Sequence, residues 1–143
     1  MTRKQQGWNM QRRFWKSNKA RSRQRHIAGT MNKTEQAYSE RLQEMVERKE
    51  IAGWRFEAVR LKLATNTYYT PDFWVQRNDG GIEIHEVKAC RANGAFLCED
   101  DARVKIKVAA EIFHEFAFVM AGKLPKKSGG HWRFEWIGGT SDG

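Results

Sequence analysis

The sequence predicts one α/β domain in which a mixed β-sheet is flanked by helices, in the order α-β-β-β-α-β-β. Two segments, 31–52 and 100–116, carry apolar residues at helical spacing, and the runs between and after them alternate apolar with polar residues. An Asn-Asp-Gly-Gly turn at 78–81 is typical of a β-hairpin. A chain of 143 residues is long enough for one such domain, and a hydrophobic fraction of 40% is ordinary for a globular protein.

The first helix is expected over 31–52. Asn32 is a suitable N-cap, and Glu35 stands three residues later, where a capping box places its acidic member. The apolar residues that follow fall on one helical face. Gly53 comes after the last turn, where a glycine commonly ends a helix.

Three strands are expected next. The first, 54–63, changes the phase of its alternation near Ala58, which predicts a β-bulge. The second, 68–76, is interrupted by Pro71, and the third, 82–89, alternates without a break. The turn between the last two predicts that they pair in an antiparallel hairpin.

The remaining elements are a helix and two strands. The helix is expected over 100–116, and the acidic residues at its start suit the helix dipole. A short apolar strand at 117–121, a basic loop at 123–130 and a strand with alternating aromatic residues at 132–136 complete the chain.

The positive charge is concentrated in residues 1–30. This segment has nine Lys or Arg and no acid, so it accounts for the whole net charge of +9, and the rest of the chain balances 17 bases with 17 acids. A basic block attracts phosphates, and the aromatic residues within it can stack on exposed bases. We expect 1–30 to be a flexible extension that contacts nucleic acid and 31–143 to be the folded domain; a merely solubilising tail is the alternative. The basic residues expected to make the contact are Arg12, Arg13, Lys16, Arg21 and Arg23.

Other features bear on location and metal class. No apolar run is long enough to span a membrane, and the N-terminus lacks the apolar region of a secretory signal. Cys90 and Cys98 suit a reducing cytosol, and with His85 and His114 they do not offer the spacing of a zinc site. We therefore expect a cytoplasmic protein with no membrane segment.

The third strand carries the residues on which the functional hypothesis depends. Ile82, Ile84, Glu86 and Lys88 share one face, because side chains alternate along a strand. Glu86 and Lys88 thus add a carboxylate and an ammonium to a face that begins with two isoleucines. Glu86 and Lys88 lie about 7 Å apart along the strand. That separation lets both act on one phosphate. The alternative is a strand end that turns to solvent and carries a surface ion pair.

Asp72 is the second acidic residue of interest. It stands between Pro71 and Phe73 in a run rich in aromatic residues, and the hairpin folds it against the third strand near Glu86. Two adjacent carboxylates repel each other unless a cation lies between them. Their hard oxygen atoms favour Mg²⁺ or Mn²⁺. A local hydrogen bond of Asp72 in a helix cap or an Asx turn is the alternative.

Together, Pro71-Asp72, a gap of thirteen residues and Glu86-Val87-Lys88 resemble the signature of the PD-(D/E)XK nuclease superfamily. That superfamily has a restriction-endonuclease-like fold, built from a helix, a three-strand meander that holds the motif, a second helix and a further strand. The order of elements expected here is similar.

A closer resemblance is to a phage-encoded branch catalogued as a domain of unknown function. The residues at 32–35, 69–73, 85–88 and 101–105 carry this likeness, which covers roughly 31–123 and leaves out the basic extension.

The resemblance implies roles for five residues. Asp72 and Glu86 would hold the metal, with the Val87 carbonyl as a further ligand, and Lys88 would orient or deprotonate the attacking water. Glu35 resembles the acidic residue that many members place on the first helix near the metal. Because Glu35 also fits a capping box, both roles stay open.

Further contacts with DNA are expected from the second helix, through Arg103, Lys105 and Lys107. For Lys105, which falls near the apolar side, extension of the side chain to solvent is an equal alternative. His85 faces away from Glu86 and is expected to be structural.

The function implied by the resemblance is a Mg²⁺-dependent DNA endonuclease that hydrolyses phosphodiester bonds. A structure-selective enzyme of phage recombination or repair, such as a Holliday junction resolvase acting on branched DNA in the host cytoplasm, is one form. Resolvases usually act as dimers, so a homodimer is left open. The alternatives are a catalytically inactive nucleic-acid-binding module of the same fold and an interaction protein whose basic tail docks on an acidic partner.

Overall fold

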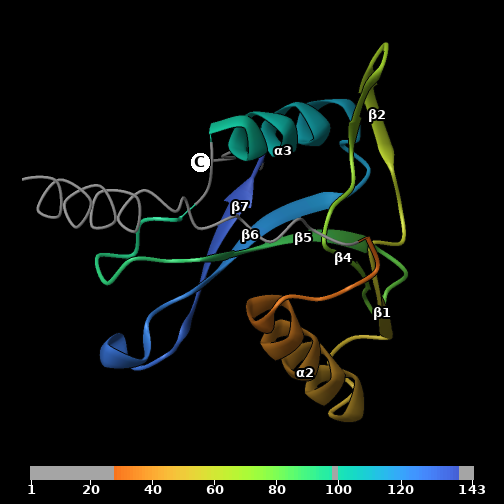
Figure 1. The fold of residues 1–143 in the computed structure, drawn as a ribbon. Helices are drawn as coiled ribbons and strands as arrows, with labels where there is room; N and C mark the ends of the chain where they lie inside the picture. Colours follow the sequence, from red (N-terminus) through yellow and green to blue (C-terminus); the bar gives the residue numbers. More distant parts are fainter. Residues whose placement is uncertain (1–27, 98–99, 139–143) are drawn as a thin grey trace, which may run out of the picture.

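The structure, a computed structural model, describes residues 28–97 and 100–138. A five-stranded mixed sheet has one helix against each face, and a small two-stranded sheet stands apart from it (Figure 1). The predicted α/β class, with a mixed sheet flanked by helices, is confirmed.

The helices and strands follow one another in an order close to the predicted one. Their bounds are α2 (Lys33–Glu47), β1 (Gly53–Phe56), β2 (Leu61–Ala64), β3 (Thr67–Tyr69), β4 (Phe73–Gln76), β5 (Ile82–Ala89), α3 (Asp100–Ile112), β6 (Ala117–Lys123), the 3₁₀ helix η1 (Lys126–Ser128) and β7 (Trp132–Ile137).

The large sheet has the strand order β1-β4-β5-β6-β7, and β2 pairs with β3 in the small one. Only the β5–β6 pair is parallel among these pairings. Parallel neighbours require a long crossover, which α3 provides. The candidate motif residues of β5 therefore lie in the central strand of the sheet.

Helix α2 begins as predicted and ends earlier. The capping box is present: the Glu35 backbone N–H donates to the Asn32 side chain, and the Asn32 N–H donates to Glu35 Oε2, both at 2.9 Å. The prediction that the helix extends to residue 52 and stops at Gly53 is wrong. Lys49 takes a left-handed conformation (φ 61°), which reverses the chain after the helix ends at Glu47, and Gly53 instead opens β1.

The expected single strand at 54–63 is two strands in two different sheets. The break lies at Glu57, whose φ is 47° and whose N–H donates to the Asp72 carbonyl at 2.8 Å. The change of phase near Ala58 therefore marks a change of sheet, and the predicted bulge is wrong. The backbone bond also ties this break to the residue that follows Pro71.

The expected strand at 68–76 is divided in the same way into β3 and β4. Pro71 lies in the break, which suits a residue without a backbone donor. Here the chain passes from the small sheet to the large one. Asp72 consequently stands immediately before β4, beside the Phe73–His85 pair that begins the β4–β5 register.

Two hydrophobic clusters hold the layers together. One includes Ile84 and Met120 of the sheet with Ile106 of α3, and the other includes Tyr38 of α2 with Phe73. Each cluster fills one side of the large sheet, as the placement of α3 and α2 in Figure 1 shows. The two polar faces of β5 are thus each enclosed by a different helix.

The second half of the chain differs from expectation only at element ends. Helix α3 ends at Ile112 instead of residue 116, β6 extends to Lys123, and the predicted basic loop contains η1. No helix within 28–97 and 100–138 is long and apolar enough to cross a membrane.

Candidate active site

Two carboxylates meet where the chain enters β4. The register pairs Phe73 with His85, so Asp72 lies one step further along, opposite Glu86. Oδ2 of Asp72 accepts a hydrogen bond of 2.7 Å from the backbone N–H of Val87. The hairpin therefore brings the two acidic residues together, as the sequence predicts.

Glu86 is fixed by two neighbours of different kinds. Its Oε2 accepts a hydrogen bond of 2.6 Å from the Tyr69 hydroxyl, and its Oε1 lies 3.4 Å from Lys88 Nζ. The Glu86 side chain is 8% exposed and that of Lys88 is 30% exposed. The lysine thus stands between a buried carboxylate and the solvent.

Both acidic residues titrate abnormally. Burial, together with the charges of Glu86 and Glu35, raises the pKa of Asp72 to about 8. Burial also raises the pKa of Glu86, although Lys88 opposes this shift. Ionisation of both carboxylates therefore costs free energy, which a cation between them would relieve.

Tyr69 is a site residue that sequence reasoning missed. Its pKa lies well above the ordinary value because of burial and the nearby Glu86 charge, so its hydroxyl remains a donor to Glu86. The residue escaped notice because 68–76 was assigned to one strand, whereas the break at Pro71 puts Tyr69 in the small sheet. The proline was the signal that could have revealed it.

Glu35 acts as a helix cap, with its side chain buried and bonded to the Asn32 N–H. Its charge also raises the pKa of Asp72, so the Glu35 carboxylate lies within electrostatic reach of that residue. The capping role is confirmed, and a direct catalytic role stays a prediction.

The donors available to a metal are few and of one chemical type. Over 28–97 and 100–138, no group of three or more His, Cys, Asp or Glu side chains is arranged to hold a metal ion. The acidic donors that lie together are Asp72 and Glu86, the backbone N–H of Val87 donates to Asp72, and the Val87 carbonyl stays a predicted ligand. Mg²⁺ keeps several waters and typically uses one or two carboxylates plus substrate phosphates. Such a small set of oxygen donors fits Mg²⁺ or Mn²⁺.

The residues predicted to contact DNA are dispersed. Arg103 donates to Glu135 at 2.9 Å and lies beside a separate pocket. Lys105 lies 3.8 Å from exposed Asp101, and Lys107 is exposed on α3. The five basic residues predicted in the N-terminal extension, Arg12, Arg13, Lys16, Arg21 and Arg23, lie outside the described residues.

His85 faces α2, away from Glu86, as predicted. Its Nδ1 lies 2.5 Å from the Tyr38 hydroxyl and its Nε2 lies 2.8 Å from Glu83 Oε1. One tautomer, with Nε2 donating and Nδ1 accepting, satisfies both contacts. The structural role expected for His85 agrees with this geometry.

No protein-family model matches the chain, and no curated protein or solved structure matches it. The likeness to PD-(D/E)XK nucleases accordingly stands on the motif and the order of elements alone.

Proposed function

We propose that the protein is a Mg²⁺-dependent endonuclease that hydrolyses DNA phosphodiester bonds at Asp72, Glu86 and Lys88. One observation carries the proposal: two buried carboxylates with raised pKa values lie side by side, with an ammonium 3.4 Å from one of them. Such an arrangement destabilises a fold, and strongly perturbed groups of this kind cluster at functional sites.

Each residue of the candidate site has a distinct role in the proposed reaction. Asp72 and Glu86 would hold the ion, with the Val87 carbonyl as a further ligand. The bound ion would lower the pKa of a coordinated water and neutralise a phosphate oxygen. Lys88, at the rim, orients the attacking water and stabilises the charge that develops on the phosphate. Tyr69 keeps the Glu86 carboxylate in place through its hydrogen bond.

The fold is compatible with this reading. A helix, a hairpin that carries the motif, a crossover helix and a parallel strand form a mixed α/β sheet, and this architecture supports the proposal of a restriction-endonuclease-like domain. Selectivity for branched DNA, action on phage recombination or repair intermediates and a homodimeric state follow from the family resemblance and form part of the proposal. A cytoplasmic location, expected from the two cysteines, also forms part of it.

The test is incubation of the full-length protein with four-way junction, flap, linear duplex and single-stranded DNA, in Mg²⁺ and in EDTA. We expect cleavage only in Mg²⁺ and none with Asp72→Ala. The matched control is His85→Gln, a buried substitution on the opposite face of β5, which should retain cleavage per folded molecule. Absence of cleavage on every substrate, or equal cleavage by Asp72→Ala, would overturn the proposal.

A second candidate is a nucleic-acid-binding module of the same fold without catalytic activity. The absence of a third acidic or histidine ligand beside Asp72 and Glu86, over the two ranges that the structure describes, favours it. This candidate predicts DNA binding that weakens steeply with salt and no turnover in any divalent metal.

A further inference from the structure

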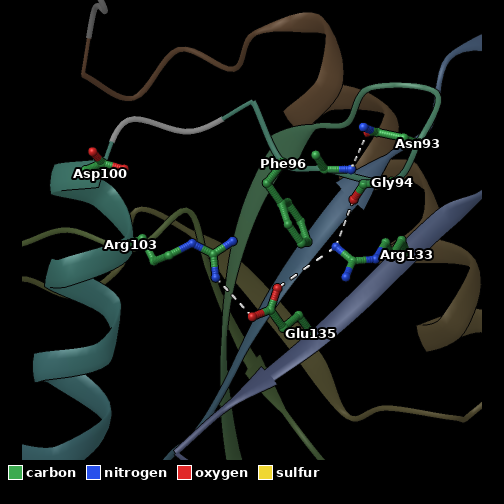
Figure 2. A pocket seen from close by; sticks show the side chains of 8 residues that line it. Asn93, Gly94, Phe96, Asp100, Arg103, Arg133 and Glu135 are labelled. Carbon is green, nitrogen blue, oxygen red and sulfur yellow. Dashed lines mark hydrogen bonds and ion pairs between the residues drawn. The ribbon is translucent and has the colours of Figure 1, made fainter.

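A pocket of about 470 Å³ opens on the face of the sheet that also bears Glu86 and Lys88. Its walls come from three parts of the chain: the loop after β5, helix α3 and strand β7 (Figure 2). The lining includes Gly94, Phe96, Asp100, Arg103, Arg133 and Glu135.

The strand register ties this pocket to the candidate active site. Glu86, Met120 and Glu135 occupy one row across β5, β6 and β7, and Lys88 and Arg133 occupy the next row. Neighbouring strands are about 4.8 Å apart, so the Glu86 and Glu135 backbones are separated by about 10 Å. A nucleotide beside a phosphate held at Lys88 can therefore reach the pocket.

Phe96 anchors a cluster of flat groups in the pocket. Its ring packs on Gly122 of β6, where an added Cβ would lie only 2.7 Å from the ring, so the close approach depends on that glycine. The guanidinium carbons of Arg103 and Arg133 lie 5.7 and 4.8 Å from the ring centroid. Aromatic rings and guanidinium planes are the groups on which proteins stack nucleobases.

The polar groups of the pocket are balanced in charge. Glu135 accepts from Arg103 at 2.9 Å and lies 3.9 Å from Arg133, which donates to the Gly94 carbonyl at 2.9 Å (Figure 2). Asp100 adds a second carboxylate to the lining, so two cations face two anions. A phosphate subsite would carry a net positive charge. This lining instead suits an uncharged planar ligand that both donates and accepts hydrogen bonds.

We propose that this pocket binds one unpaired nucleobase of the DNA substrate, and that guanine fits it best. Guanine presents two adjacent acceptors, O6 and N7, to an arginine and also carries N–H donors for a carboxylate. This inference rests on the proposed nuclease function and deepens it. Because a base must leave its duplex to enter the pocket, the site would favour DNA with an unpaired nucleotide beside the cleaved bond.

The experiment measures binding without turnover, by fluorescence anisotropy in EDTA, on the full-length protein. The probes are single-stranded thymidine oligonucleotides of equal length, with or without one central guanine. We expect the guanine to strengthen binding about tenfold. Phe96→Leu, which keeps apolar packing on Gly122, and Glu135→Gln should each remove that preference, whereas Arg48→Ala, which removes an exposed charge from the end of α2, should keep it.

Equal binding of the two probes by the wild-type protein would overturn the inference, as would an undiminished guanine preference in either pocket variant. These outcomes are independent of the nuclease proposal. Guanine-selective binding without any Mg²⁺-dependent cleavage would contradict only the proposed nuclease function. Cleavage with no preference for guanine would contradict only the assignment of the pocket.

Discussion

Strand β5 presents two buried polar faces that differ in their charge balance. His85 and Glu86 are neighbours, each 6% exposed. On the α2 side, His85 is held between Tyr38 and Glu83 in a closed set of hydrogen bonds. On the α3 side, Glu86 lies beside a second carboxylate, Asp72, and both pKa values are raised. Burial of a polar group is therefore compatible with a purely structural role, and the proposed function depends instead on two buried carboxylates side by side with an ammonium beside Glu86.

The residues around the two faces of β5 also differ in how tightly they are packed. Tyr38 packs edge to face against Phe73 and Trp132, with ring centroids 5.4 and 4.9 Å apart, so its hydroxyl is held by a rigid apolar frame. Lys88, by contrast, is partly exposed beside Glu86. One face is closed by hydrogen bonds and ring contacts, and the other has a partly exposed lysine at its edge.

The largest expected effect is on the cleavage rate, through the face of β5 that carries Glu86 and Lys88. Lys88→Ala should lower the rate of Mg²⁺-dependent cleavage by about 10²–10⁴-fold, the usual contribution of a group that positions or deprotonates the nucleophile. Single-turnover cleavage assays measure it. Lys62→Ala, which removes an exposed lysine from β2, is the charge-matched control and should leave the rate unchanged. Similar rates for both variants would remove Lys88 from the mechanism.

The pH dependence of stability should reflect the same face. The folded pKa of Asp72 is about 8, above the ordinary 3.8, so the folded state binds more protons than the unfolded state between these values. The contribution of Asp72 is therefore fully present below pH 4 and is lost as the pH rises through 8. We expect the Tm in EDTA to fall over this window and the fall to be smaller in Asp72→Asn. A Tm that rises with pH in the wild-type protein but not in Asp72→Asn would contradict this account.

A substitution on the α2 side of β5, where Tyr38 meets His85, should change stability alone. Tyr38→Phe leaves the buried Nδ1 of His85 without its partner, which typically destabilises a protein by about 1–3 kcal/mol. Chemical denaturation measures the loss. Cleavage per folded molecule should be preserved, and a variant as stable as the wild type would show that this network does not hold α2 to the sheet.

The smallest expected effect on stability is an increase. Glu86→Gln should raise the Tm of the metal-free protein, because it removes the repulsion between two buried carboxylates, while it abolishes cleavage. The amide oxygen can still accept the Tyr69 hydrogen bond. Thermal unfolding in EDTA provides the measurement, and a lower Tm for Glu86→Gln would mean that the carboxylate pair does not strain the fold.

The core of the candidate site could be predicted because its determinants are local. Asp72 and Glu86 are joined by one hairpin, whose turn is evident at 78–81, and strict alternation over 82–89 places Glu86 and Lys88 on one face. No distant packing is needed to bring these groups together. The capping role of Glu35 is local for the same reason.

The remainder depends on contacts that local pattern does not encode. Alternating apolar residues stand on both sides of Glu57 and Pro71, so each transfer of the chain between the two sheets resembles an irregularity within one long strand. The Arg103–Glu135 pair joins residues 32 positions apart, and it forms only because β7 returns beside β6 under α3. The pocket with Phe96 consequently could not be predicted.

The most direct test of the central claim is a Mn²⁺ titration of the full-length protein, with free Mn²⁺ followed by electron paramagnetic resonance. The account predicts that the wild-type protein removes Mn²⁺ from the free pool, that Mg²⁺ competes, and that the double variant Asp72→Asn, Glu86→Gln loses this binding while it stays folded. Equal Mn²⁺ uptake by the two proteins, or none by the wild type, would contradict a metal centre between these carboxylates.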